Sequence, residues 1–323
     1  MALDDRALLL QREMFFRVTG LTKPPIAVAR ALAQAASDLY FEPGATLFQR
    51  GDEPDGIYFI VEGEVMLEAP DEEPWHFDTG SVVGVLDVNL ERPRARTATA
   101  QTHVHAMFVQ GEDFLEVLED NFDYAIGSRG AVAGDLHKFV IELAPSGGFE
   151  DPPPQDELDV LPEMNAVARL VVLRSLPLFF RASVQALASV AGVAESIELE
   201  PSQVLFEAGG SVGFIYVVAW GIIEITRALD PVVHARFGPS QLVGGAGTFG
   251  GKLSEYGARA TTRATVLRIA LADLDDVAED HYDLTRSVIQ GLAIEREKLM
   301  ILRARARPSL ELAAYAPAKP SGG

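Results

Sequence analysis

Residues 41–67 read FEPGATLFQRGDEPDGIYFIVEGEVML, and residues 199–225 read LEPSQVLFEAGGSVGFIYVVAWGIIEI. Matched residues in the two stretches lie 158 positions apart: Pro43 and Pro201, Leu47 and Leu205, Gly51 and Gly209, Tyr58 and Tyr216, Gly63 and Gly221. Farther along, the spacing becomes 160 positions, as from Gly84 to Gly244 and from Thr102 to Thr262. Self-similarity at a fixed period indicates a duplicated structural unit, and a net insertion of two residues in one loop accounts for the changed spacing.

The duplication divides the chain into two domains with a linker between them. Residues 144–159 read APSGGFEDPPPQDELD and cannot continue a helix or a central strand, because three successive prolines lack backbone N–H groups. We therefore expect domain 1 at residues 1–143, a linker at residues 144–159, domain 2 at residues 160–307 and a disordered tail at residues 308–323.

Local patterns inside each copy predict short strands between helices. The apolar runs at residues 57–61 and 65–67 flank Gly63, and those at residues 214–218 and 222–225 flank Gly221, a pattern typical of a hairpin with a glycine turn. Helical periodicity occurs at residues 26–36, 114–118, 124–143, 163–173, 183–194 and 274–305. The expected fold class is α+β, with two tandem β-rolls of the double-stranded β-helix or jelly-roll-like kind, each flanked by helices.

Composition excludes several classes of function. The chain has no cysteine, which rules out disulfides, thiolate metal sites and cysteine nucleophiles. Its formal net charge of −20 repels nucleic acid. No apolar run reaches the roughly 18–20 residues that a membrane span needs, and the opening MALDDRALLLQRE lacks the basic start of a secretory signal. We expect a cytoplasmic protein with no membrane span and no nucleic-acid partner.

The first quoted stretch resembles the opening of the cyclic-nucleotide-binding domain family, which includes kinase regulatory subunits and catabolite-activator-type regulators. The resemblance covers about residues 18–143 and 174–300. Its most specific element is a phosphate-binding cassette, in which Gly-Glu is followed by Pro-Arg-Ala-x-Thr; residues 84–102 here read GVLDVNLERPRARTATAQT. The resemblance implies ligand-binding roles for the matching residues: Gly84, Val85, Leu86, Pro93, Arg94, Ala95 and Thr97. Residues 84–97 are called the cassette below.

The cassette of the first copy contains half of the family's ligand-binding groups. A cyclic phosphate is an anion, which the N–H groups at a short helix start and the guanidinium of Arg94 can bind. In the family, a glutamate after the glycine accepts the ribose 2′-hydroxyl. Here that position is Val85, which cannot accept a hydrogen bond, and Asp87 is a candidate substitute two residues on. Arg94 could alternatively belong to an exposed run with Arg92 and Arg96, and Thr97 could be an ordinary strand threonine.

The second copy departs further from the family pattern. Gly245 stands at the position of Val85, and Ser254 stands at the position of Arg94. Arg259 lies nearby but aligns with Thr99. We therefore do not expect orthodox cyclic-nucleotide binding by domain 2.

Other candidate sites in the sequence are weak. Residues 245–250 spell GxGxxG, but a dinucleotide site requires a helix directly afterwards, and a strand-like run follows here. His103 and His105 share a strand face, but no third metal ligand is placed near them, so a solvated face is the better interpretation.

These observations favour a regulatory or adaptor protein and not an enzyme. Domain 1 would sense a phosphate-containing ligand such as cyclic AMP, cyclic GMP or a cyclic dinucleotide, and we expect no catalytic residue, metal or other cofactor. A ligand-free pseudo-receptor that acts as an interaction scaffold is one alternative, and a sensor of a cyclic dinucleotide or another phosphorylated metabolite is the other. Because the residues after Arg305 do not predict a helix-turn-helix module, a signal would pass to a protein partner or to another copy of the chain.

Overall fold

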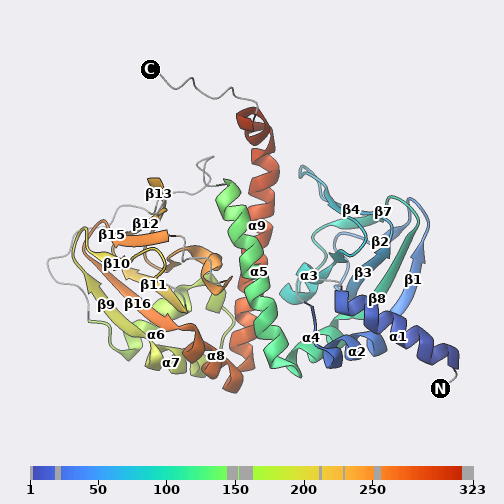
Figure 1. Cartoon of the computed structure of the whole chain (residues 1–323), viewed down its shortest axis with the longest axis horizontal. Helices are drawn as coiled ribbons and strands as arrows, with labels where there is room; N and C mark the ends of the chain where they lie inside the picture. The colour runs from blue at the N-terminus through green and yellow to red at the C-terminus, as the bar shows by residue number, and fades with distance from the viewer. Residues whose placement is uncertain are drawn as a thin grey trace. The chain divides into compact units, whose positions relative to one another are not determined.

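The computed structural model describes residues 3–18, 23–143, 152, 163–210, 213–227, 230–250 and 256–314. Its contacts divide the chain into two compact units, each made of three segments and each containing one roll (Figure 1). Unit 1 comprises residues 1–132, 177–189 and 274–294, and unit 2 comprises residues 133–176, 190–273 and 295–323. The linker expected at residues 144–159 lies outside the described residues except for Pro152, and the domain boundaries stay predictions.

The roll of unit 1 is built from two four-stranded antiparallel sheets, with strand orders β1-β8-β3-β6 and β2-β7-β4-β5. Its strands are β1 Ser37–Phe41, β2 Thr46–Phe48, β3 Gly56–Glu62, β4 Val65–Glu68, β5 Trp75–Phe77, β6 Val82–Val83, β7 Thr97–Ala100 and β8 Val104–Gln110. The helices before, within and after it are α1 Leu3–Val18, α2 Ile26–Ala35, α3 Val85–Leu90, α4 Gly111–Glu119 and α5 Phe122–Leu143.

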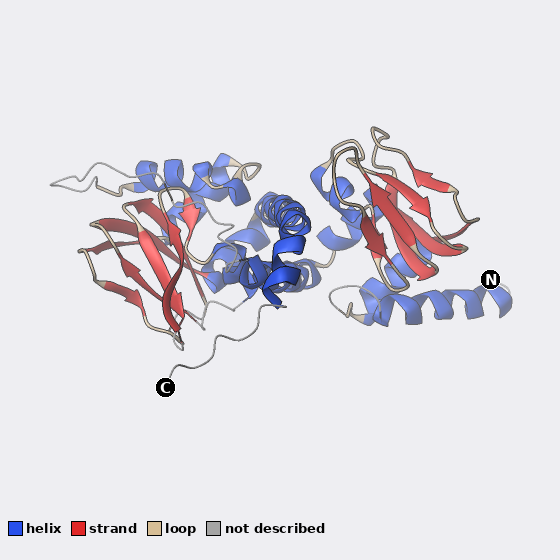
Figure 2. Ribbon diagram, turned by 90° about the horizontal axis from the view of Figure 1, so that it is seen from above, coloured by secondary structure: helices blue, strands red, loops and turns tan. Residues whose placement is uncertain are grey.

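Strand β3 is buried on both faces, which explains its continuous apolar run. Tyr58 and Ile60 point into the roll, where they pack with residues of both sheets. Ile57 and Phe59 point to the opposite face and pack against a second cluster that includes Phe16 of α1 and residues of α2. Alternate side chains of a strand face opposite ways, so the strand joins the interior of the roll to the helical layer beside it (Figures 1 and 2).

The hairpins predicted around Gly63 and Gly221 are wrong. Strands β3 and β4 belong to different sheets, so the chain turns a corner of the roll at Gly63 and does not double back. Gly63 has a φ of +98°, and a Cβ there would lie 2.2 Å from the carbonyl oxygen of His103. The glycine is therefore required both by the left-handed backbone and by the close approach of another strand.

Unit 2 repeats the architecture, with sheet orders β10-β15-β12-β13 and β14-β11-β16-β9. Tyr216 and Val218 of β11 take the places of Tyr58 and Ile60 in its core. Its strands are β9 Glu195–Leu199, β10 Val204–Phe206, β11 Phe214–Trp220, β12 Ile223–Arg227, β13 Asp230–Phe237, β14 Gln241–Leu242, β15 Tyr256–Ala260 and β16 Ala264–Ala270. The remaining helices of the chain are α6 Ala166–Ser175, η2 Pro177–Phe179, α7 Val184–Val193, η3 Gly245–Gly250, α8 Leu271–Asp280 and α9 Tyr282–Ala314.

The predicted fold class, two tandem β-rolls flanked by helices, is confirmed, but three helical details differ from the sequence prediction. Helix α1 lies before the first of the predicted helical segments. The single helix predicted at residues 274–305 is two, α8 and α9, which are separated at His281. Helix α9 also continues past Pro308 to Ala314. Among the described residues, no helix combines the length and hydropathy needed to cross a bilayer.

Candidate functional site

The cassette of the first roll begins with a glycine that no other residue could replace without strain. Gly84 follows β6 with a φ of +84° and is the N-cap residue of α3. A Cβ at this position would lie 2.6 Å from Nη1 of Arg94. Glycine therefore allows both the left-handed turn into α3 and the close approach of the arginine.

Arg94 is buried, its backbone N–H donates to the carbonyl oxygen of Asp52 at 2.8 Å, and its side chain is held by several contacts. Its side chain has 0% exposure. Nη1 donates to the carbonyl oxygen of Gly84 at 2.8 Å, and Nη2 donates to the Gly56 carbonyl oxygen at 2.6 Å and to Oδ1 of Asp55 at 2.9 Å. The guanidinium also lies over the ring of Phe48, with Cζ 4.2 Å from the ring centroid. A charge is tolerated in such a position because it is paired and hydrogen-bonded.

One nitrogen of the Arg94 guanidinium has no hydrogen-bond acceptor among the described residues. Nε is buried and has no hydrogen-bond partner within the described part of the chain. Arginine has five N–H donors in a rigid planar arrangement, and a buried donor that is left unpaired costs about 1–3 kcal/mol. Nε could therefore take one further acceptor, which would have to enter the buried interior of the cassette.

On the ribose side of the cassette, the structure places an apolar side chain and a carboxylate that is already paired with an arginine. Val85 is half-buried and packs against the apolar cluster of α1 and α2. The carboxylate of Asp87, the candidate substitute, is also buried, and its Oδ1 accepts from Nε of Arg92 at 2.9 Å. Asp87 therefore already has a cationic partner within the cassette.

The other predicted residues are spread along the cassette. Leu86 and Ala95 are half-buried and Pro93 is exposed. Oγ1 of Thr97 accepts from the backbone N–H of Arg50 at 3.0 Å, which fits a strand threonine that fixes a turn. Of the predicted set, the hydrogen bonds of the side chains join only Gly84 and Arg94 directly.

The arginine run 92–96 is not an exposed face. Arg96 is buried, lies 3.8 Å from the ring centroid of Trp75, and donates to the carbonyl oxygen of Glu73 at 3.1 Å. It also pairs with the carboxylate of Glu72. Arg94 and Arg96 are buried while Pro93, Ala95 and Thr97 are not, which places both arginines on the inward side of the chain, each over an aromatic ring.

Sequence reasoning missed the groups that hold Arg94. Asp55, Gly56 and Phe48 all lie inside the repeated stretch at residues 41–67, but their partner is 38 to 46 positions away. The only signal for these contacts in the sequence was the acidic turn GDEPDG at residues 51–56, which places the carboxylate of Asp55 directly before β3.

The equivalent loop of the second roll has a different structure. Gly244 has a φ of +82°, like Gly84, but a 3₁₀-helix at Gly245–Gly250 follows it, and β15 comes after that. Thr248 is buried and donates from Oγ1 to the carbonyl oxygen of Val243 at 3.2 Å. The GxGxxG stretch therefore does not open a dinucleotide-binding helix. Ser254 lies outside the described residues.

The remaining candidates have ordinary partners. Nε of Arg259 donates to Oε1 of Glu224 at 2.6 Å across strands β15 and β12. His103 pairs with Glu42 and His105 with Asp38, at 3.0 and 2.8 Å. Among the described residues, no three histidine, aspartate or glutamate side chains cluster in a way that could hold a metal ion.

Comparison with known proteins gives a family match in both rolls. The model of the cyclic nucleotide-binding domain matches residues 38–121 and again residues 196–281, together more than half of the chain. This confirms the resemblance inferred from the repeated stretch and the cassette.

Similar solved structures include the regulatory domain of Toxoplasma gondii PKA with cAMP, at 13% identity and a TM-score of 0.33, covering 88% of this chain and 96% of that one. The regulatory subunit of a cAMP-independent protein kinase A from Trypanosoma brucei has 14% identity and a TM-score of 0.32, covering 87% and 90%. The corresponding subunit from Trypanosoma cruzi, bound to guanosine, has 13% identity and a TM-score of 0.32, covering 97% and 92%. These scores are too low to match individual residues.

Proposed function

The chain belongs to the cyclic nucleotide-binding domain family, and from this premise we propose that it is a non-catalytic regulatory protein whose first roll binds a phosphate-containing ligand at Arg94. The unpaired Nε of this buried arginine supports the proposal most directly. A phosphate oxygen that accepts from Nε would form a charge-assisted hydrogen bond, and bonds of this kind contribute about 1.5–3 kcal/mol each.

The ligand is a cyclic nucleotide or a cyclic dinucleotide that the cassette recognises through phosphate more than through ribose. Val85 offers no acceptor to a ribose hydroxyl, and Asp87 is engaged by Arg92. Such a site discriminates less strongly between sugars than one with a glutamate at position 85, because a binding site rejects an analogue most strongly when it would leave a buried polar group unpaired. Cyclic AMP, cyclic GMP and cyclic dinucleotides are the ligands to compare.

A ligand-free scaffold is the second candidate, and a specific observation favours it. Three N–H groups of Arg94 already donate to Gly84, Gly56 and Asp55. A side chain with these bonds holds β3 and the cassette together whether or not a ligand is bound. In this alternative, the arginine is structural and the rolls serve to bind a protein.

For either candidate we propose a cytoplasmic protein that acts on a separate protein partner or on a second copy of itself. The net charge of −20 supports a partner other than nucleic acid. Both sequence matches fall on binding domains, which supports the absence of a catalytic role.

The test is a thermal-shift panel with cyclic AMP, cyclic GMP and cyclic dinucleotides on wild type, Arg94→Lys and Arg96→Lys. Both variants replace a buried guanidinium that lies over an aromatic ring, so Arg96→Lys controls for destabilisation. Ligand at about 100 times its Kd adds about 2.7 kcal/mol to the free energy of unfolding, which is a Tm shift of several degrees.

Each shift is measured from the variant's own ligand-free Tm. The sensor proposal predicts a shift in wild type and in Arg96→Lys and none in Arg94→Lys. The absence of a shift with every ligand, in a protein that melts cooperatively, would overturn the sensor and leave the scaffold. An equal shift in all three proteins would place the ligand away from Arg94.

A further inference from the structure

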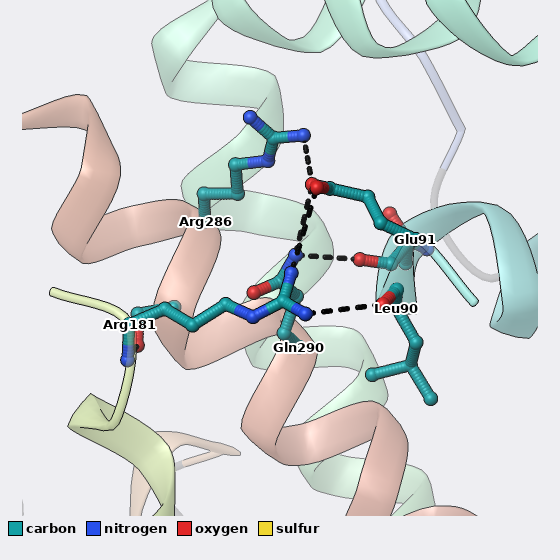
Figure 3. A network of polar contacts seen from close by, with 7 residues as sticks. Leu90, Glu91, Arg181, Arg286 and Gln290 are labelled. Atoms are coloured by element: carbon teal, nitrogen blue, oxygen red, sulfur yellow. Dashed lines mark hydrogen bonds and ion pairs between the residues drawn. The ribbon is translucent and has the colours of Figure 1, made fainter.

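The end of cassette helix α3 contacts two segments of unit 1 that come much later in the sequence. Nε2 of Gln290, in α9, donates to the carbonyl oxygen of Asn89 at 2.7 Å. Nη2 of Arg181, just before α7, donates to the carbonyl oxygen of Leu90 at 3.4 Å. Figure 3 shows both side chains reaching the last turn of α3. The segments 177–189 and 274–294 therefore take part in the structure of the first cassette.

These two bonds satisfy groups that α3 cannot satisfy itself. The last carbonyls of any helix lack intrahelical donors, and α3 has only six residues. The N–H of the C-cap residue, Glu91, donates back to the carbonyl oxygens of Asp87 and Val88, which leaves those of Asn89 and Leu90 for other donors. Gln290 is itself 1% exposed, so its amide is placed there by the packing of α9.

The side chain of Glu91 adds a second set of contacts. Its carboxylate pairs with Arg286 of α9, lies 3.6 Å from Nη1 of Arg181, and accepts from Nε2 of Gln290 at 3.4 Å (Figure 3). Glu91 adopts a left-handed conformation with a φ of +50°, which glycine would adopt with less strain. A glutamate at this position therefore places a carboxylate where two arginines and an amide converge.

Each end of α3 is thus fixed by a side chain that donates to a backbone carbonyl oxygen there. Arg94 binds the carbonyl oxygen of Gly84 at the start, and Gln290 binds that of Asn89 at the end. At about 1.5 Å per residue, the two ends of this helix are about 9 Å apart. A helix so short moves as one piece, so a displacement at its end also displaces Gly84 and its contact with Arg94.

We propose that Gln290, with Arg181 and Arg286, is a positioning residue for the first cassette, so that docking of α9 on α3 sets the affinity of the site at Arg94. The ligand part of this statement rests on the proposed function. Coupling between sites is reciprocal, so a ligand that orders the start of α3 also holds α9 against its end.

The test uses the full chain and compares Gln290→Leu with Thr285→Val. Leucine is similar in size to glutamine but apolar, so the substitution removes the donor to Asn89. Thr285 lies on the same helix and is equally buried, and its Oγ1 has no hydrogen-bond partner within the described residues. Thr285→Val is therefore a matched control that leaves the contact with α3 intact.

Two measurements are made on each variant. Hydrogen exchange of the peptides that cover α3 is measured without ligand, and the Kd for cyclic AMP is measured by calorimetry. We expect faster exchange of α3 and a Kd raised at least about fivefold in Gln290→Leu, and wild-type values in Thr285→Val. If Gln290→Leu does not fold, Arg286→Gln, which removes a half-exposed partner of Glu91, should give smaller changes in the same direction.

The outcomes separate this inference from the sensor proposal. Unchanged exchange of α3 in Gln290→Leu would overturn the positioning role. Faster exchange with an unchanged Kd would overturn the coupling. If wild type binds no cyclic AMP, no cyclic GMP and no cyclic dinucleotide, the sensor proposal and the coupling both fail, while the exchange measurement still decides whether Gln290 positions α3.

Discussion

The loops after β6 in the first roll and after β14 in the second start alike and then diverge. Val83 and Val243 are both fully buried, and the glycines that follow them have φ values of +84° and +82°. After Gly84 comes an α-helix and then the buried Arg94. After Gly244 comes a 3₁₀-helix, in which the hydroxyl of Thr248 donates back to the carbonyl oxygen of Val243. The roll therefore needs the glycine turn but not one particular loop after it.

The parts of the two rolls outside this loop are closely matched. Oγ1 of Thr102 accepts from the N–H of Glu64 at 3.0 Å, and Oγ1 of Thr262 accepts from that of Ile222 at 3.0 Å. The N–H groups of Ala100 and Ala260 each donate at 2.9 Å to a carbonyl oxygen in the turn that precedes a short strand. The two rolls therefore share a scaffold and differ in the loop that follows the glycine turn.

The largest expected effect tests whether the scaffold is equivalent in both rolls. We expect Gly63→Ala and Gly221→Ala each to lower the free energy of unfolding by about 3–5 kcal/mol, because each combines a left-handed φ with a clash against backbone. The new Cβ would lie 2.2 Å from the carbonyl oxygen of His103 in the first roll and 2.3 Å from that of Arg263 in the second.

Urea denaturation measures this effect roll by roll, since the chain has two tryptophans, Trp75 in the first roll and Trp220 in the second. The unfolding of each roll is followed through its own tryptophan, in a variant whose other tryptophan is replaced by Phe. Gly51→Ala and Gly209→Ala are the matched controls, because they also have positive φ but nothing lies within 4 Å of the new Cβ; they should cost about 1–2 kcal/mol. A large loss of unfolding free energy in only one roll would contradict the prediction that the two scaffolds are equivalent.

A smaller effect distinguishes the rolls by their dependence on acid. Burial alone would raise the pKa of Asp38, but hydrogen bonds from Arg12 and His105 outweigh it and hold the pKa below its usual 3.8. Its ion pairs stabilise the first roll above that pH, and the stabilisation is lost as the pH falls through the lower folded value. The second roll has Ser196 and Thr265 at the equivalent positions.

Asp38→Asn should therefore remove part of the acid-dependent loss of stability seen at Trp75, by about 1 kcal/mol or less. The transition seen at Trp220 should not change. The measurement is the urea midpoint of each tryptophan signal between about pH 2.5 and pH 6, a window around the usual pKa of aspartate. The prediction would be wrong if the wild type and the variant lost stability in parallel over this range.

The smallest effect has the opposite sign. Oγ1 of Thr265 is buried without a hydrogen-bond partner among the described residues, and its residue pairs with Trp220 across strands β16 and β11. Thr265→Val keeps the shape and removes the unpaired hydroxyl, so it should raise the free energy of unfolding by up to about 1 kcal/mol. Urea denaturation followed at Trp220 checks it, and a clear destabilisation would reveal a partner for the hydroxyl.

The repeat in the sequence was sufficient to predict the fold, because paired positions such as Tyr58 and Tyr216 fix the spacing of two like domains. The positive φ of Gly51 and Gly209 was also predictable, since only glycine adopts it freely. The pairing of strands was not. Alternation of apolar residues shows which face of a strand is buried, but it does not show which sheet the strand joins. The sequence pattern therefore predicts a hairpin where the chain turns a corner of the roll at Gly63.

The candidate site was predictable only at its centre. The register of the cassette identified Gly84 and Arg94, and the structure joins them. The burial of Arg94 depends on Phe48 and Asp55, which lie far away in the sequence, and the acidic turn at residues 51–56 does not by itself show that Asp55 pairs with Arg94. Gln290 reaches Asn89 across 201 positions, and contacts of that separation follow from the packing of helices that no local pattern encodes.

The assembly of unit 1 from three segments constrains how the protein is made. A nascent chain folds its domains from the N-terminus as they emerge, but unit 1 includes residues 274–294. Roughly 140 residues separate Val132 from Leu274, and at about 5–20 residues per second their synthesis takes on the order of 10 s. During that interval, Gln290 has not yet been synthesised, so the last turn of α3 lacks its donor. The nascent first roll then has only its own core to protect it from aggregation.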